Sequence, residues 1–262
     1  MKTKYILKKY SIKAKRSLGQ NFLVDYNIIS KIISSADLEP NDIILEIGPG
    51  LGILTKELAK RAKKVLAVEK DDKLCVILKQ ELKDYPNIEI INADILKYII
   101  HNTRYKILAN LPFNIASAVI RKFLETGNKP QAMILMLQKE VAQRITAEPP
   151  NMNILAVSVQ LYAKPEILFY ISKSSFWPQP KVDAAMLKID KIKSPQINTG
   201  LFFKIVKAGF SNPRKQLINN LSSGFKKPKQ EISEWLQKNN INPTQRAQTL
   251  SVDNWLDLLK ML

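Results

Sequence analysis

The apolar positions of this chain follow two different periods. Between residues 42 and 147, short runs of β-branched and other apolar residues alternate with longer segments in which apolar residues recur every three to four positions. The short runs are typical of buried strands, and the longer spacing is typical of amphipathic helices. Their alternation predicts an α/β fold with a doubly wound parallel sheet. The expected strands are 43–47, 65–69, 88–92, 106–109 and 132–137, and the expected helices are 51–61, 71–83, 115–125 and 139–147.

The pattern changes twice in the second half of the chain. Strand-like runs follow one another with no helix between them, at 155–163, 166–171 and 184–190, which predicts an antiparallel finish to the sheet. Residues 191–200 are rich in Ser, Pro and Asn and form the best candidate linker. Helical spacing then returns at 201–210, 214–221, 229–239 and 252–262.

These changes predict three parts. We expect a basic arm at 1–20, a Rossmann-like domain at 21–192 and a small all-helical domain at 200–262. The chain has 262 residues, of which 45% are hydrophobic and 24% charged, and this is an ordinary globular composition. No apolar run approaches the roughly 20 residues that span a bilayer, and the N-terminal apolar stretch is too short for a signal peptide. A cytoplasmic protein without a membrane segment is the expectation.

Two residue types are almost missing from the chain. Cys75 and His101 are the only cysteine and the only histidine. A lone cysteine excludes an intramolecular disulfide. With only one cysteine and one histidine, the usual zinc sites and nucleophiles activated by histidine are not expected. We therefore expect no metal, and a reaction that needs little acid–base machinery.

Basic residues give the chain a formal net charge of +18. The excess is uneven, because residues 1–20 carry +7, 21–100 carry −2, 101–190 carry +5 and 191–262 carry +8. A core flanked by basic ends suits a polyanionic partner, since neutralised phosphates supply most of the nonspecific affinity for nucleic acids. An anionic membrane surface is the competing polyanion.

A glycine-rich turn at 46–52 follows the first expected strand and precedes the first expected helix. Its spacing is G-x-G-x-G, and Gly48 and Gly50 would let a ligand approach the backbone. Glu69 ends the next strand 21 positions after Gly48, near the offset of about 20 at which a carboxylate meets ribose hydroxyls. Asp94 follows the third strand, where it can accept from an adenine amine. Each feature alone also fits a turn or a helix cap. Together they indicate an adenosine-containing cofactor, either a nicotinamide dinucleotide or S-adenosylmethionine.

The tetrad Asn110-Leu111-Pro112-Phe113 follows the fourth expected strand. The lone pair of an adenine N6 amine is delocalised into the ring, so the amine is a poor nucleophile until acceptors hold its two hydrogens. The Asn110 side-chain oxygen and the Leu111 carbonyl can hold them, Pro112 adds no competing N–H, and Phe113 can stack on the base. A methyl sulfonium is already a strong electrophile, so positioning suffices without a metal or a strong base. The tetrad therefore favours methyl transfer over hydride transfer.

Five ordered motifs together resemble the ribosomal RNA adenine dimethyltransferase family, and most closely its bacterial small-subunit members. They are 17–23 (SLGQNFL), the glycine turn at 46–52, the tetrad at 110–113, 137–144 (LQKEVAQR) and 176–182 (FWPQPKV). The resemblance covers nearly the whole chain. It implies a class I methyltransferase that uses S-adenosylmethionine to dimethylate the N6 amines of two adjacent adenosines near the 3′ end of 16S rRNA. The implied setting is an assembling small ribosomal subunit, with the protein expected as a monomer.

The resemblance also implies a set of cofactor contacts. Asn21 and Leu23 would contact the cofactor from the arm, Gly48 would face its methionine part, Glu69 its ribose and Asp94 its adenine. The basic arm and the helical tail would bind RNA phosphates.

At the base, Asn110 would border the cofactor and hold the target amine, while Phe113 and Phe176 would enclose the flipped adenine. Two departures from the family pattern concern the RNA. Phe113 stands where the family most often has tyrosine, which keeps the stacking face and loses a hydroxyl. The loop at 148–154 is shorter than usual, which puts RNA handling rather than cofactor binding in doubt.

Two other functions stay open. Related large-subunit rRNA methyltransferases that confer macrolide resistance share the glycine turn and the tetrad, although the motif at 176–182 and the tail favour the small-subunit members. A noncatalytic RNA-binding assembly or transcription factor is the third alternative. It would have no reason to retain Glu69, Asp94 and Asn110 together.

Overall fold

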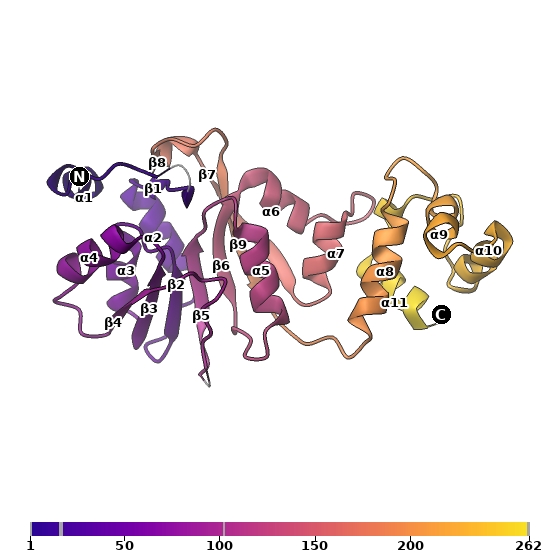
Figure 1. Cartoon of the computed structure of the whole chain (residues 1–262), viewed down its shortest axis with the longest axis horizontal. Helices are drawn as coiled ribbons and strands as arrows, with labels where there is room; N and C mark the ends of the chain where they lie inside the picture. The colour runs from indigo at the N-terminus through magenta and orange to yellow at the C-terminus, as the bar shows by residue number, and fades with distance from the viewer. Residues whose placement is uncertain (1, 16–17, 102, 261–262) are drawn as a thin grey trace. The chain divides into compact units, whose positions relative to one another are not determined.

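Two compact units make up the chain. The computed structural model describes residues 2–15, 18–101 and 103–260. Contacts assign the chain up to residue 142 and residues 164–192 to the first unit, and residues 143–163 and 193–262 to the second. The first unit is α/β, whereas the described part of the second is helical (Figure 1).

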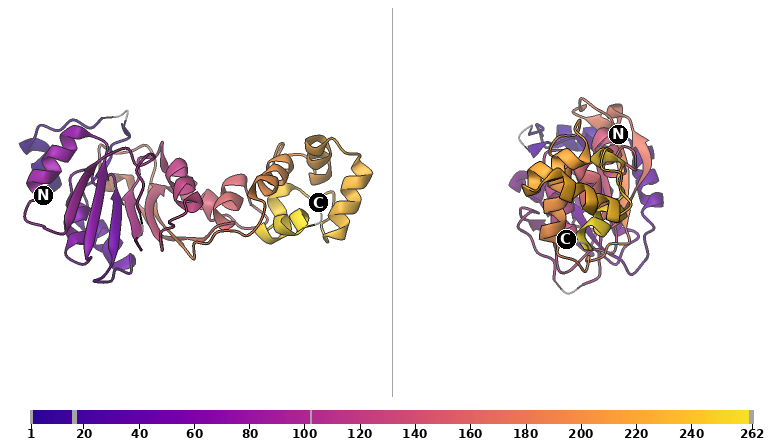
Figure 2. Two further views of the ribbon diagram at one scale, coloured as in Figure 1. Left: turned by 60° about the horizontal axis from the view of Figure 1, so that its bottom comes forward. Right: turned by 90° about the vertical axis from the view of Figure 1, so that its right-hand side faces the viewer.

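A seven-stranded mixed sheet forms the centre of the first unit (Figure 2). Its strands, in spatial order, are β4 (Ile88–Asn92), β3 (Lys64–Glu69), β2 (Ile43–Ile47), β5 (Lys106–Asn110), β6 (Met133–Gln138), β9 (Ala184–Asp190) and β7 (Lys164–Ile171). The first five are parallel, and β9 runs antiparallel to both β6 and β7. The predicted parallel core and antiparallel finish are both confirmed. The order of the strands reverses between β2 and β5, and sheets of this kind bind ligands outside the carboxyl ends at such a point.

Helices cover both faces of this sheet. On one face, α2 (Tyr26–Ser35), α3 (Ile53–Ala59) and α4 (Asp72–Glu81) share a buried apolar cluster with strand residues such as Ile44 and Leu108. Side chains alternate between the faces of a strand. The neighbouring strand residues therefore point to the other face, where α5 (Ala116–Glu125) buries an apolar side of its own.

The N-terminal arm is part of this unit. It contains α1 (Lys2–Lys9), and Ile6, Leu7 and Ile12 belong to the same buried apolar cluster. Further along, β1 (Phe22–Leu23) pairs antiparallel with β8 (Phe176–Trp177), which follows the short 3₁₀ helix η2 (Lys173–Ser175). Residues 16 and 17 of the arm lie outside the described residues.

The second unit contains the predicted C-terminal helices. After α6 (Lys139–Ile145), which begins in the first unit, it has α7 (Ile154–Gln160), α8 (Thr199–Gly209), α9 (Leu217–Phe225), α10 (Lys229–Lys238), the 3₁₀ helix η3 (Ala247–Thr249) and α11 (Val252–Lys260). Residues 261–262 of the expected last helix lie outside the described residues. None of the helices in the described ranges is long and apolar enough to cross a bilayer.

One predicted strand, 155–163, is wrong. Residues 154–160 form the helix α7, and its start is fixed by Asn153, whose side-chain oxygen accepts from the Ala156 N–H. Gln160 holds the other end by donating to the carbonyls of Ile145 and Ala147. The β-branched residues favour a strand locally, but these caps and the burial of one helical side override that preference. As a result, 143–163 joins the helical unit instead of extending the sheet.

Candidate active site

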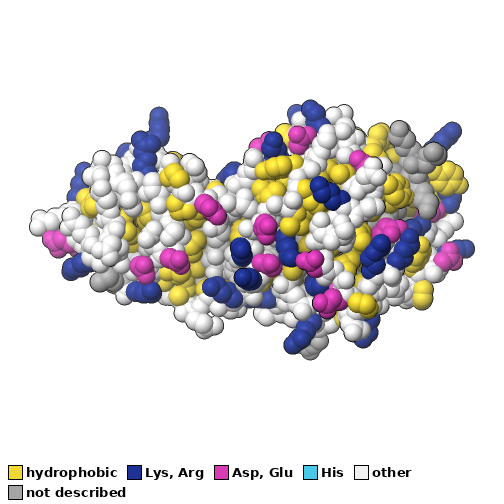
Figure 3. All heavy atoms as spheres, turned by 180° about the vertical axis from the view of Figure 1, so that it is seen from behind, with side chains coloured by type: hydrophobic (Ala, Val, Ile, Leu, Met, Phe, Trp, Pro, Cys, Tyr) yellow, Lys and Arg dark blue, Asp and Glu magenta, His cyan; other side chains and the backbone are white. Residues whose placement is uncertain are grey.

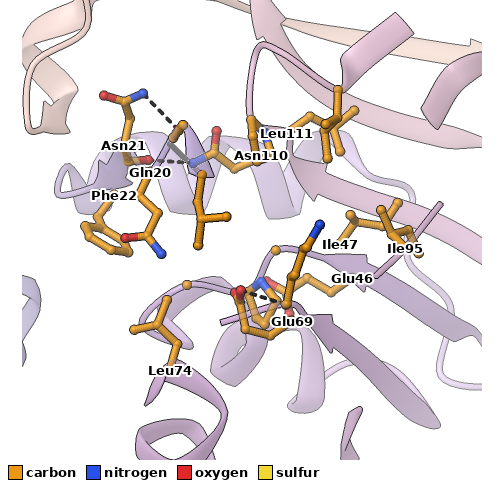
Figure 4. A pocket seen from close by; sticks show the side chains of 18 of the residues that line it. Gln20, Asn21, Phe22, Glu46, Ile47, Glu69, Leu74, Ile95, Asn110 and Leu111 are labelled. Atoms are coloured by element: carbon orange, nitrogen blue, oxygen red, sulfur yellow. Dashed lines mark hydrogen bonds between the residues drawn. The ribbon is translucent and has the colours of Figure 1, made fainter. Parts of the chain in front are cut away.

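A cavity in the first unit lies at the carboxyl ends of the parallel strands. Its lining comes from the turns after β2, β3, β4 and β5, together with residues 18–23 of the arm and Phe176 (Figure 4). All the residues that the sequence indicated for catalysis or cofactor binding line this cavity: Asn21, Leu23, Gly48, Gly50, Glu69, Asp94, Asn110, Leu111, Pro112, Phe113 and Phe176. Six separated segments of the chain thus meet at one place.

The glycine turn forms the floor of the cavity at the end of β2. Gly50 has a φ of +59°, and a Cβ atom there would lie 3.2 Å from the ring of Phe22. Only glycine combines this backbone conformation with so close an approach. The glycine turn is therefore packed directly against Phe22 of the arm.

Glu69 ends β3 with a carboxylate that is already held in place. Its Oε1 accepts from the backbone N–H groups of Lys70, at 2.8 Å, and Asp71, at 2.9 Å. Burial raises the pKa of Glu69, while the backbone donors Asp71, Lys70 and Gly50 oppose the rise. Each carboxylate oxygen has two lone pairs, so the Glu69 carboxylate can still accept from a ligand hydroxyl group.

Asp94 follows β4 and is ion-paired. Its Oδ2 lies 2.8 Å from Lys70 Nζ, and its Oδ1 accepts from the Leu96 N–H at 2.9 Å. The hydrogen bond from Lys70 holds the pKa of the Asp94 carboxyl below its usual range. The group is therefore a charged acceptor at the rim of the cavity.

Glu46 is a site residue that the sequence analysis did not single out. It lies on β2 with 2% of its surface exposed, and its Oε2 has no hydrogen-bond partner among the described residues. Burial raises the pKa of Glu46 to about 8, and the nearby Glu69 carboxylate adds to the rise. The signal in the sequence is a single acidic residue inside an otherwise apolar strand, next to the glycine turn. An unpaired buried carboxyl that lines a cavity suits a cationic ligand group.

Asn110 at the end of β5 is oriented by the arm. Its Nδ2 donates to the backbone carbonyl of Asn21 at 3.0 Å (Figure 4). A carbonyl can only accept, so the NH₂ group of Asn110 must face the arm, and its Oδ1 is directed away from it. The Asn110 side chain is thereby set as an acceptor within the cavity.

The rest of the tetrad is fixed by short-range contacts. The Leu111 N–H donates to the Met136 carbonyl, and the Ile115 N–H donates to the Pro112 carbonyl, which closes a turn. Phe113 is half-buried and Phe176 is buried at 4% exposure. Both rings line the same cavity as Asn110.

The cavity also includes Gly19 and Gln20, which belong to the motif at 17–23 but were not singled out there as site residues. Their place follows from tertiary contacts alone. Within the ranges that the structure describes, the His, Cys, Asp and Glu side chains form no group of three or more that could hold a metal ion.

Comparison with known proteins places this site in a family. The model of the family described as "Ribosomal RNA adenine dimethylase" matches residues 11–262. A curated relative, ribosomal RNA small subunit methyltransferase A of Dehalococcoides mccartyi, is 42% identical over an alignment of 261 residues that covers 96% of this chain and 89% of the relative.

Two solved structures share the fold and 27% sequence identity. A dimethyladenosine transferase from Plasmodium falciparum superposes with a TM-score of 0.79 over 91% of this chain and 96% of its own. The 23S rRNA methyltransferase ErmE superposes with a TM-score of 0.76 over 92% of this chain and 99% of its own. The family match spans the arm, the sheet and the helical tail together, and the chain belongs to the ribosomal RNA adenine dimethylase family.

Proposed function

We propose that this protein uses S-adenosylmethionine to dimethylate the N6 amines of two adjacent adenosines near the 3′ end of 16S rRNA. The orientation of Asn110 carries the proposal, because it presents an amide oxygen, rather than an N–H, inside the cavity. The family and the small-subunit relatives supply the class of RNA. We place the activity on a monomer in the cytoplasm, during assembly of the small subunit.

The residues of the cavity fit S-adenosylmethionine. The Oε2 atom of the buried Glu46 lacks a hydrogen-bond partner among the described residues and would accept a ligand ammonium group, and the Glu69 carboxylate would accept a ribose hydroxyl. Gly48 and Gly50 leave the backbone open to the methionine part, Asn21 and Leu23 would contact the cofactor from the arm, and Asp94 would accept from the adenine amine. When bound, this cofactor supplies an electrophilic methyl group on a sulfonium centre.

The tetrad would prepare the target nitrogen for this methyl group. The Asn110 Oδ1 and the Leu111 carbonyl would each accept one N6 hydrogen, which draws the nitrogen lone pair out of the ring system. Stacking of the flipped adenine between Phe113 and Phe176 would hold the nitrogen on line with the methyl carbon. After the first transfer one N6 hydrogen remains, and a single acceptor is enough to hold it for the second.

Proton removal places no demand on the protein. An N6 nitrogen that has gained a methyl group and still carries its protons is a strong acid, so water can take the extra proton. This agrees with a cavity whose polar groups are amides, carbonyls and carboxylates placed for hydrogen bonding. Positive charge on the helical unit and the arm would attract the RNA backbone.

The test is to supply the purified protein with methyl-labelled S-adenosylmethionine and small subunits that lack the modification. Mass spectrometry of the nucleosides should show two labelled N6,N6-dimethyladenosines in each 16S rRNA. Large subunits tested in parallel should stay unlabelled. Labelled adenosine in 23S rRNA alone would instead support the large-subunit activity, and no labelled nucleoside in either RNA would contradict an enzymatic function.

A further inference from the structure

The basic N-terminal arm makes its polar contacts with acidic residues of its own unit. Lys9 Nζ lies 2.7 Å from the Glu81 carboxylate, and the Tyr10 hydroxyl donates to the same carboxylate at 2.7 Å. Lys15 Nζ lies 2.9 Å from Asp71. Two arm cations that the charge pattern offered to RNA are therefore already neutralised within the protein.

Asp71 is the point where the arm meets the cofactor site. It is 5% exposed, and its carboxylate accepts from Lys15 Nζ at 2.9 Å and Gln20 Nε2 at 3.1 Å. Its backbone N–H donates to Glu69 Oε1 at 2.9 Å. Burial would raise the pKa of the Asp71 carboxyl, but Lys15 and Gln20 hold it below its usual range. A single residue thus contacts both the arm and the carboxylate expected at the ribose.

The name strap is used here for Lys15 together with residues 18–23. The strap contacts Asp71 at one end and reaches the tetrad further along. The Gln20 side chain is fixed at both of its ends, because its Oε1 accepts from the Lys15 N–H at 2.8 Å. The next residue, Asn21, supplies the carbonyl that receives Asn110 Nδ2. On the other side of Gln20, a Cβ atom on Gly19 would lie 3.2 Å from Pro112 Cβ. The strap therefore touches the tetrad on both sides of Gln20.

The far end of the strap is held by the segment around Phe176. Phe22 and Leu23 pair with Trp177 and Phe176, and the Val24 N–H donates to the Ser175 carbonyl at 2.8 Å. With this end tied to β8, the anchor at Asp71 sets the path of residues 19–21 in between. A shift at Asp71 is thus transmitted to the Asn21 carbonyl.

We propose that Asp71 is a positioning residue for methyl transfer, which acts by anchoring the strap through Lys15 and Gln20 so that the Asn21 carbonyl orients the Asn110 amide. The proposal rests on the proposed function of Asn110 and extends it to Asp71 and Lys15, which are not among the residues that line the cavity. In this proposal the Lys15 cation pairs with Asp71 beside the cofactor site. If the arm instead served only to bind phosphates, the Lys15 cation would pair with RNA. Geometric errors of about 1 Å can lower a rate about 100-fold, so loss of the anchor has a measurable cost.

The decisive experiment compares Lys15→Ala with Lys13→Ala. Lys13 is an exposed cation two positions away on the same arm, so its removal changes the net charge equally and leaves the anchor intact. The dissociation constant for S-adenosylmethionine is measured by calorimetry without RNA, and kcat and KM are measured on small subunits. Hydrogen exchange of amides 18–23 in the free protein reports directly on the strap.

Lys15→Ala should weaken cofactor binding about 10-fold, lower kcat by about 10-fold or more and speed exchange of the strap amides, with KM for the subunit unchanged. Lys15→Arg, which keeps the cation, should restore all three quantities. Lys13→Ala should leave cofactor binding, kcat and exchange unchanged. Equal increases in KM for both alanine variants, with cofactor binding unaltered, would show that the arm cations bind RNA and would overturn the proposal.

A second variant, Asp71→Asn, separates positioning from folding. Asparagine keeps a side-chain acceptor for the Lys73 N–H at the start of α4 but loses the charge that pairs with Lys15. The same losses in cofactor affinity and kcat are expected, with a melting temperature close to that of the original protein. Unchanged cofactor affinity and kcat in this variant would refute the role of Asp71. The proposed function fails by a different result, the absence of dimethyladenosine with the unaltered protein.

Discussion

At the residue scale, the Asn110 side chain ends in one donor group and one acceptor group, and the two have different tasks. The donor bonds to the Asn21 carbonyl, and this contact leaves the acceptor directed into the cavity, where we propose that it holds the target amine. A residue with only an acceptor could not make the first contact. Asparagine suits this position because it has both a donor for the arm and an acceptor for the proposed reaction.

Replacement of Asn110 should separate these two tasks. Asn110→Ala removes both groups, and Asn110→Asp keeps an acceptor but places a carboxylate against the Asn21 carbonyl. We expect kcat to fall at least about 100-fold in both variants, with subunit binding retained. Asn92→Ala, which removes an amide from the end of β4, is the matched control and should remain active. Full dimethylation by either Asn110 variant, measured by nucleoside mass spectrometry, would contradict the assigned role.

Glu46 makes stability depend on pH. Its folded pKa of about 8 lies above the ordinary value of 4.5, so the folded protein binds one more proton than the unfolded chain between these values. The free energy of unfolding therefore falls as pH rises from about 4.5 to about 8. The full difference is about 5 kcal/mol as an upper bound, at 1.36 kcal/mol for each pKa unit. Glu46→Gln carries no such titration.

Melting temperatures of both proteins between pH 5 and pH 9 test this prediction. The two should be similar near pH 5, and the glutamine variant should be the more stable at pH 9. Parallel pH profiles in the two proteins would show that Glu46 stays ionised in the folded state.

At the scale of elements, the strap and the tetrad depend on the absence of a side chain at Gly19. This residue has a φ of +64°, and a Cβ atom would lie 3.2 Å from both Pro112 Cβ and Asn114 Oδ1. Gly19→Ala should strain the backbone by about 1 kcal/mol and push the strap off the tetrad. We expect weaker cofactor binding and a lower kcat.

Gly127→Ala is the matched control for this substitution. It lies after α5, and a Cβ atom there would meet nothing within 4 Å. Its melting temperature and its affinity for S-adenosylmethionine should equal those of the original protein. If calorimetry and thermal unfolding do not distinguish Gly19→Ala from this control, the close contact between Gly19 and Pro112 does not affect cofactor binding or stability.

The elements themselves were largely predictable because most bury one regular side. Each parallel strand has a short apolar run, and α3 to α5 have apolar residues at helical spacing, so local sequence and tertiary packing agree there. The helices α1 and α2 were not among the predicted ones. α7 is the exception, since its β-branched residues favour a strand while its caps and its buried side favour a helix. The start of α9 also shifted, from the expected 214 to Leu217, because Asn212 closes a turn on the N–H of Arg214.

At the scale of the whole molecule, net charge and charge distribution are separate properties. The chain carries +18, yet on the face shown in Figure 3 the Lys and Arg side chains are spread among acidic ones. Several cations of the chain are paired with acidic side chains, such as Lys60 and Arg61 with Glu57. The cations that count for RNA are the ones that remain exposed and uncompensated.

Salt dependence should distinguish these two kinds of cation. Arg214 and Lys215 are exposed at the turn before α9, and replacement of both with alanine should lower the slope of log affinity for rRNA against log salt by about 1 to 2. Replacement of Lys60 and Arg61 with alanine removes the same formal charge just after α3 and should change the slope less. Filter binding over a range of salt concentrations measures both. Equal slopes in the two double variants would indicate a diffuse charge effect.

The sequence by itself determined the class of fold, the residues that line the cavity and the tetrad at the end of β5. It could do so because glycine turns, strand-end carboxylates and the tetrad are local patterns, and because parallel strands bring their carboxyl ends to one edge. Tertiary structure alone decided the contacts between distant segments: the unpaired state of Glu46, the Asp71 anchor and the Asn21 carbonyl at Asn110. Burial and hydrogen-bond partners depend on which segments pack together, and a linear pattern does not specify them.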